Sequence, residues 1–206
     1  MADHTTYGLV CSELSEDLSK TNLGELKLDS FQDNSVQIKI KAASLNFPDL
    51  LMTQGKYQNR PDLPFALGME GAGIVEKVGS GVSSFKEGDE VMFGGWGHGA
   101  IAESIILPEG LVSLKPKSLN FSEAASFKTA YLTAYVGLIR RGELKQGETL
   151  LVHGASGGVG MAAVQMGKLY GARVIASGTS DEKLKIVKTW GADEIINTCL
   201  LYTSDA

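Results

Sequence analysis

A glycine-rich stretch near residue 157 has the residue types and spacing that could hold a phosphate group. Ala155, Gly157 and Gly160 stand at the three glycine positions of the GxGxxG fingerprint, with alanine replacing the first glycine. Gly157 leaves room for a diphosphate to approach the backbone, and Gly160 lets a helix lie close to the preceding strand. The residues predicted to contact a dinucleotide here are Ala155, Ser156, Gly157, Gly158, Val159 and Gly160.

The segments around this bend are those that would position it. Residues 149–153 form a short apolar run, a helix rich in small residues is expected from near Val159 to Gly171, and residues 173–177 form a second apolar run. This order of strand, glycine turn, helix and strand is a βαβ unit. A glycine turn alone is also compatible with simple tight packing, but in this order it favours nucleotide binding. The free N–H groups at the helix start would face the phosphates.

The end of the second strand bears on the choice of nucleotide. An acidic residue that would bind the ribose of NAD is expected there, but the chain has Gly178, Thr179 and Ser180, with Lys183 shortly after. We therefore predict NADPH rather than NADH, with Gly178, Ser180 and Lys183 at the cofactor. The alternative is that Lys183 is simply a solvated lysine. Asp181 and Glu182, which precede Lys183, oppose the preference for a 2′-phosphate because they are negatively charged, unless they serve to cap the next helix.

The remaining sequence divides near residue 122. Residues 122–206 read as α/β, with a helix from Ser122 as N-cap to Gly142, the βαβ unit, a further helix ended by Gly191 and a strand at 194–197. Residues 1–121 read as β-rich, barrel-like or sandwich-like. Strands are expected there at 36–40, 72–78, 90–93 and 100–107, and 46–67 reads as a loop-rich stretch.

Composition excludes several other classes. The chain has 206 residues, 43% of them hydrophobic, and a formal net charge of −5, which argues against nucleic-acid partners. We expect no membrane span and no secretory signal, hence a cytoplasmic protein, with an organellar location left open. The two cysteines, Cys11 and Cys199, are far apart and are expected as free thiols, and no metal site is expected.

Three stretches together resemble a known family. These are "AASLNFPDLLMTQGKYQNRPDLPFALGMEGAGIVEKVGSGVSSFKEGDEV", "AASFKTAYLTAYVGL" and "LLVHGASGGVGMAAVQMGKLYGARVIA". They are similar to the zinc-independent quinone oxidoreductases, the zeta-crystallin-like branch of the medium-chain dehydrogenase/reductase superfamily. The resemblance covers about residues 36–197. It implies a GroES-like β-domain (1–121) followed by a Rossmann domain (122–206), with the cofactor in the cleft between them.

The resemblance also bears on metal chemistry and on site residues. Where zinc alcohol dehydrogenases of the superfamily hold catalytic zinc through Cys and His, this chain has Asn46 and Met69, neither a credible zinc ligand. The resemblance implies that Asn46 and Tyr57 lie over the nicotinamide side as candidate catalytic residues, and that Thr133 contacts the nicotinamide. Each has a structural alternative: Asn46 bonding loop backbone, Tyr57 packing, and Thr133 bonding its own helix.

Three further residues are assigned structural roles. Glu70 follows the lost histidine position and is expected to make structural hydrogen bonds rather than act as a base. His153 is expected to be packed or bonded to backbone, and His98 to lie in a turn.

The resulting hypothesis is an NADPH-dependent hydride transfer to a quinone or other conjugated enone. The alternatives are a non-catalytic, crystallin-like nucleotide-binding protein and an enoyl reductase domain. The resemblance ends at about Thr198, and we expect an N-terminal fragment with a partial Rossmann domain that reduces quinones weakly or not at all. A homodimer is expected at full length.

Overall fold

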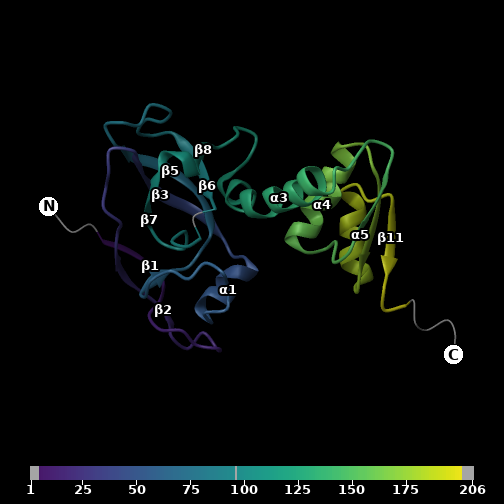
Figure 1. Ribbon diagram of the computed structural model, residues 1–206, viewed down its shortest axis with the longest axis horizontal. Helices are drawn as coiled ribbons and strands as arrows, with labels where there is room; N and C mark the ends of the chain where they lie inside the picture. Colours follow the sequence, from purple (N-terminus) through teal and green to yellow (C-terminus); the bar gives the residue numbers. More distant parts are fainter. Residues whose placement is uncertain (1–4, 96, 201–206) are drawn as a thin grey trace. The chain divides into compact units, whose positions relative to one another are not determined.

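The computed structural model describes residues 5–95 and 97–200, and the chain divides into two compact units, Met1–Thr129 and Ala130–Ala206 (Figure 1). The division falls within helix α3 (Lys128–Tyr135). The first unit is rich in strands and the second is α/β, which confirms the predicted fold class. Residues 201–206, most of the atypical end of the sequence, lie outside the described residues.

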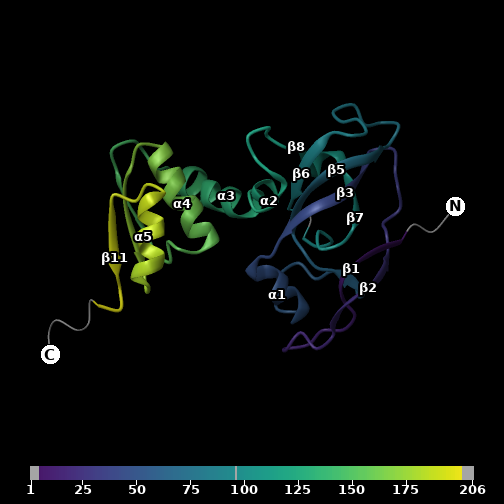
Figure 2. The same cartoon turned by 180° about the vertical axis from the view of Figure 1, so that it is seen from behind.

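The first unit contains two antiparallel sheets. Five strands are ordered β7-β3-β5-β6-β8, with β3 (Ser35–Ser44) between β5 (Glu70–Val78) and β7 (Ser104–Pro108), as Figure 2 shows from behind. The bounds of the other two are Glu90–Gly94 for β6 and Val112–Leu114 for β8. The second sheet has the order β2-β1-β4, formed by β1 (Thr5–Cys11), β2 (Thr21–Lys27) and β4 (Phe65–Ala66).

Alternating side chains from the five-stranded sheet build the main core of this unit. Val36 and Ile38 on β3 are fully buried against Val75, Val91 and Phe93 from the neighbouring strands. The expected alternation at 36–40 is therefore confirmed, and the strand continues to Ser44.

The sequence analysis was incomplete for one segment of the first unit and wrong about another. The stretch 46–67 is not only loop, because it contains helix α1 (Phe47–Thr53) and β4. The expected strand 100–107 begins only at Ser104. Before it, the Ile101 N–H donates to the Leu67 carbonyl and the Ile101 carbonyl accepts from the Leu9 N–H, so this residue bonds to the smaller sheet and the residue after β4. The strands β1 and β2 were not predicted.

The second unit has a three-stranded parallel sheet ordered β11-β10-β9. β9 (Thr149–Val152) and β10 (Arg173–Gly178) are joined by α4 (Gly158–Leu169), and β10 and β11 (Glu194–Asn197) by α5 (Asp181–Thr189). α4 packs on β9 and β10, and α5 on β10 and β11. The βαβ unit is confirmed, with its helix beginning one residue before Val159.

The helix expected from Ser122 is interrupted. α2 (Phe121–Ala125) begins after Asn120, whose side chain accepts from the Glu123 N–H at 2.9 Å while Glu123 accepts from the Asn120 N–H at 2.8 Å. This reciprocal capping makes Asn120, not Ser122, the N-cap. α3 follows, and its last part widens into a π-helical segment, η2 (Val136–Arg141). A short 3₁₀ turn, η1 (Glu109–Leu111), lies between β7 and β8.

Both cysteines are free thiols, as expected. Cys11 is completely buried in β1, whereas Cys199 is exposed beyond β11. Among residues 5–95 and 97–200, no helix is both long and apolar enough to cross a bilayer.

Candidate functional site

The turn between β9 and α4 is a tightly folded backbone bend. The Ala155 N–H donates to the Ser177 carbonyl on β10 at 3.0 Å, which ties the bend to the sheet. The Gly157 N–H donates to the Gly154 carbonyl at 3.0 Å. Gly160 lies so close to this bend that a Cβ there would overlap the Gly154 carbonyl oxygen and stand 2.8 Å from the Ala155 Cα. The expected close approach of helix and strand is therefore present.

The outer side of the same bend is open. A Cβ on Gly158 would meet no heavy atom within 4 Å, and one on Gly157 only the Gly154 carbonyl oxygen at 3.4 Å. Gly157 is the N-cap of α4 and supplies no capping side chain, so the N-cap does not occupy the amides that begin this twelve-residue helix. A hollow of about 530 Å³ borders the bend from His153 to Gly160.

This bend has the features that binding of an anion such as a diphosphate requires. Its amides are donors at the positive end of a helix dipole, and the glycines leave the space that a ligand's oxygens need. Ser156 and Val159 are exposed beside these glycines, whereas Ala155 is fully buried and contributes its backbone.

The turn between β10 and α5 lies at the same edge of the sheet, because β9 and β10 are adjacent and parallel. Ser180 is the N-cap of α5, and its Oγ accepts from the Lys183 N–H at 3.4 Å. The Lys183 side chain is exposed. The Asp181 carboxylate accepts a 2.7 Å hydrogen bond from the Asn197 amide, so this acid is already engaged. The structure thus brings Gly178, Ser180 and Lys183 to the edge that carries the glycine bend.

The candidate catalytic residues of the first unit flank helix α1. Asn46 precedes the helix, and its N–H donates to the Asp49 carboxylate at 2.7 Å. Its side-chain Nδ2 donates to Glu70 Oε1 at 3.0 Å. Asn46 therefore uses one side-chain N–H for Glu70 and its side-chain oxygen in the capping box with Asp49, which leaves its second side-chain N–H for another partner.

Glu70 is a buried carboxylate whose two oxygens are both bonded. It is 1% exposed, and Oε2 accepts from the Thr129 N–H in the first turn of α3 at 2.7 Å. A carboxylate at the N-terminus of a helix is also stabilised by the helix dipole. The expected structural role of Glu70 agrees with these bonds.

Asp49 is the second buried acid of this group, and the sequence analysis did not single it out. Its other oxygen accepts from the Gly68 N–H at 3.1 Å. Burial raises the pKa of Asp49, the two backbone N–H donors oppose this, and the nearby Glu70 adds to the rise. The spacing of Asn46 and Asp49 is a capping-box pattern, and this signal could have revealed both α1 and its acid.

The two other predicted contact residues have different surroundings. Tyr57 is half-buried and packs against a cluster made by Cys11, Met52, Phe65 and Leu67. Thr133 is exposed on α3 in the second unit. Tyr57 is therefore at least partly a packing residue.

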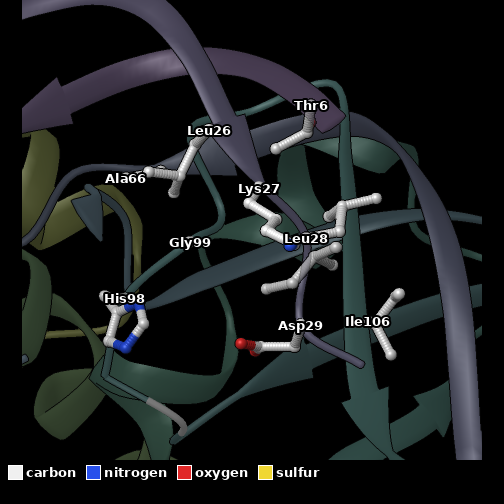
Figure 3. Close-up of a pocket in the computed structure, with 10 residues that line it drawn as sticks. Thr6, Leu26, Lys27, Leu28, Asp29, Ala66, His98, Gly99 and Ile106 are labelled. Carbon is white, nitrogen blue, oxygen red and sulfur yellow. The ribbon is translucent and has the colours of Figure 1, made fainter. Parts of the chain in front are cut away.

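A separate hollow of the first unit contains His98. Figure 3 shows the Asp29 carboxylate directed toward the His98 ring. Leu26 and Ala66 also line this hollow. The ring also lies 5.9 Å from that of Phe65, centroid to centroid. Burial lowers the pKa of His98 and the Asp29 charge opposes this shift. His98 is thus more enclosed than a simple turn residue.

Within the part of the chain that the structure describes, no three His, Cys, Asp or Glu side chains group in a way that could hold a metal ion. Asn46 and Met69, the residues at the expected zinc positions, carry side chains that are poor zinc ligands.

Two family models match this chain. Residues 32–117 match the alcohol dehydrogenase GroES-like domain and residues 158–205 match the zinc-binding dehydrogenase family. The second match continues beyond Thr198, where we expected the resemblance to end.

Individual relatives agree with these matches. Quinone oxidoreductase from Homo sapiens is 38% identical over 166 residues, 81% of this chain and 50% of the relative. The structure of Pseudomonas syringae quinone oxidoreductase has a TM-score of 0.85 at 35% identity and covers 93% of this chain and 58% of that one. The CurK enoyl reductase structure has a TM-score of 0.83 at 31% identity, covering 93% and 59%. The chain spans about half the length of the curated quinone oxidoreductases that it matches.

Proposed function

Because this chain belongs to the quinone oxidoreductase branch of the medium-chain dehydrogenase/reductase superfamily, we propose that it is an NADPH-dependent oxidoreductase of quinones or other conjugated enones that works without zinc. The observation that carries this proposal is the open, uncapped bend between β9 and α4. Gly157 and Gly158 leave space on the outer side of this bend, whereas Gly160 packs tightly against its inner side.

The bend would hold the diphosphate through the amides of Gly158, Val159 and Gly160. These are the first N–H groups of α4, and a negatively charged ligand there gains both hydrogen bonds and the favourable end of the helix dipole. When bound, the nicotinamide cofactor supplies hydride for the reaction.

The preference for NADPH rests on the β10–α5 turn. The turn offers Lys183 as an exposed cation and has no acid before Asp181. Asp181 is paired with Asn197 at the end of β11, and Asp181 and Glu182 lie in the first turn of α5, where an acid stabilises the helix. A 2′-phosphate would therefore face Lys183 and the Ser180 turn, with Asp181 already engaged by Asn197.

Zinc independence rests on the donor set. An amide at Asn46 and a thioether at Met69 replace the side chains that would hold zinc in the alcohol dehydrogenases that the sequence resembles. An electron-poor acceptor needs less activation than an alcohol, because only a developing oxyanion has to be stabilised.

The Asn46 amide is the proposed donor that stabilises this developing oxyanion. Glu70 accepts one N–H of Asn46, which holds the plane of the amide and leaves its second N–H to donate to an acceptor's oxygen. Tyr57, with its phenol at the edge of a packed cluster, is the second proposed donor.

Two measurements test the proposal. Calorimetric titration of the 206-residue chain with NADPH and with NADH should show binding of both, with NADPH tighter. Loss of nicotinamide absorbance with a simple quinone then measures turnover, which we expect to be weak in this chain. Failure to bind either dinucleotide would contradict the proposal.

The same measurements separate two further candidates. A non-catalytic nucleotide-binding protein would bind NADPH and reduce neither quinones nor enones. An enoyl reductase, suggested by the similarity to CurK, would prefer an enoyl thioester to a quinone. We further propose a cytoplasmic protein with a small-molecule substrate, no nucleic-acid partner and a homodimeric full-length form.

A further inference from the structure

A histidine and a buried serine form a side-chain pair directly beside the glycine bend. His153 follows the last residue of β9, and its Nδ1 lies 2.8 Å from the Oγ of Ser177 on β10. Ser177 is 3% exposed, whereas the His153 ring is exposed. The expectation that His153 is packed or bonded to backbone is therefore wrong: its partner is a side chain and its outer edge is open.

The pair orients the ring. Ser177 Oγ has one other close partner, the Val152 carbonyl at 3.4 Å, which is long for a hydroxyl donor. The 2.8 Å contact is compatible with either direction of donation, and when the hydroxyl donates to Nδ1 the ring proton is on Nε2. In that tautomer the outward nitrogen of His153 is a hydrogen-bond donor.

That donor borders the hollow of the glycine bend. His153 lines the same hollow as Gly157, Gly158 and Gly160. An N–H at this border adds a side-chain donor to the backbone donors at the start of α4, on the side where β9 ends.

We propose that His153 binds the diphosphate of the dinucleotide through Nε2–H and that Ser177 positions the ring for this contact. The inference rests on the proposed nucleotide binding and names one more residue of that site. A hydrogen bond to a charged oxygen is stronger than one between neutral groups, so its removal should weaken binding clearly.

The competing explanation is purely structural. In it, the bond between His153 and Ser177 only ties β9 to β10, and the outer nitrogen contacts water. The two explanations differ in which nitrogen matters: the inner one for structure, the outer one for ligand binding.

Two substitutions separate the two nitrogens. In His153→Asn the short amide can still reach Ser177, but nothing replaces the outer donor. In His153→Gln the longer amide places an N–H near the position of Nε2. Both variants and the wild type are titrated calorimetrically with NADPH and with NADH, and their thermal unfolding is recorded by circular dichroism.

We expect His153→Asn to weaken both dinucleotides by about tenfold or more, with an unchanged ratio between them and an unchanged unfolding midpoint. His153→Gln should bind within about threefold of the wild type. Equal affinities of wild type and His153→Asn would overturn the role of His153 while leaving the proposed function intact. A selective loss of NADPH affinity would also overturn it, because the contact would then be to the 2′-phosphate. A wild-type chain that binds neither dinucleotide would overturn both.

Discussion

Gly160→Ala tests whether the approach of α4 to β9 depends on a missing side chain. The added methyl would overlap the Gly154 carbonyl oxygen and lie 2.8 Å from the Ala155 Cα and 3.0 Å from the Ala155 carbonyl carbon. All three are backbone atoms, so no side-chain rotation can relieve the overlap. Either α4 moves away from the bend, or the bend itself moves.

The expected loss of stability follows from three contributions. Overpacking of this kind costs about 1–3 kcal/mol. The Gly154 carbonyl also accepts the Gly157 N–H, and weakening that bond adds about 1 kcal/mol. Replacing a helical glycine by alanine returns about 1 kcal/mol of helix propensity. The net loss is about 1–3 kcal/mol, or roughly 5–20 °C in the unfolding midpoint of a unit of this size.

Gly157→Ala is the matched control. Its Cβ would lie 3.4 Å from the Gly154 carbonyl oxygen, an ordinary contact, and its φ of −82° suits any residue. We expect its midpoint to move by only a few degrees, less than for Gly160→Ala, since alanine at an N-cap is less favourable than glycine by less than about 1 kcal/mol. Its methyl would occupy the space proposed for the diphosphate, so NADPH binding should be lost.

The assay is thermal unfolding followed by circular dichroism, together with calorimetric titration of NADPH. We expect opposite patterns for the two variants. Gly160→Ala mainly loses stability, whereas Gly157→Ala loses NADPH binding with little loss of stability. A Gly160→Ala variant as stable as the wild type would refute the close packing. A Gly157→Ala variant with unchanged NADPH affinity would refute the site of the diphosphate.

Three other perturbations test separate parts of the molecule. Lys183→Glu should lower the ratio of NADPH to NADH affinity by at least about tenfold, measured calorimetrically, because a carboxylate repels a 2′-phosphate; an unchanged ratio removes Lys183 from the site. Because burial lowers the pKa of His98 from 6.5, the unfolded chain binds more protons below that value, and the free energy of unfolding should fall as the pH drops through it. Urea titrations across this range should show a flatter curve for His98→Gln, and equal curves would contradict the burial effect. Glu70→Gln should destabilise the protein by about 1–3 kcal/mol in urea titration, because one of the two donors, Asn46 Nδ2 or Thr129 N–H, would then face an amide NH₂; no loss would show that these bonds are dispensable.

The βαβ unit could be predicted because its signals are local. Apolar strands, a glycine bend and a helix of small residues follow one another within about thirty residues, and each element forms mainly with its sequence neighbours. Separate roles could also be assigned in advance to Gly157 and Gly160, and the open space at Gly157 and the close contact at Gly160 agree with those roles.

The first unit was predicted less well because its strands depend on distant partners. β1 pairs with β2 and β4, and its residues Thr5–Cys11 carry no strict alternation of apolar and polar types. The short α1 has a proline at its start and lies in a glycine- and proline-rich stretch, so its composition suggests a loop. Only the Asn46 and Asp49 capping pattern indicated a helix.

The hydrogen-bond partners of Glu70 could not be assigned from sequence, because the partners of a buried acid are set by tertiary structure. Glu70 bonds Asn46, twenty-four residues away in the chain, and Thr129, fifty-nine residues away. The same holds for His153, whose partner Ser177 is reached only because β9 and β10 are paired.

The contrast between the two cysteines has a practical consequence for such measurements. Cys11 is shielded inside a sheet, while Cys199 lies at the surface two residues after Asn197, the partner of Asp181 at the start of α5. A thiol-reactive fluorophore should therefore label the native protein once, at Cys199. Quenching of such a dye would report occupancy of the nearby turn without any engineered residue.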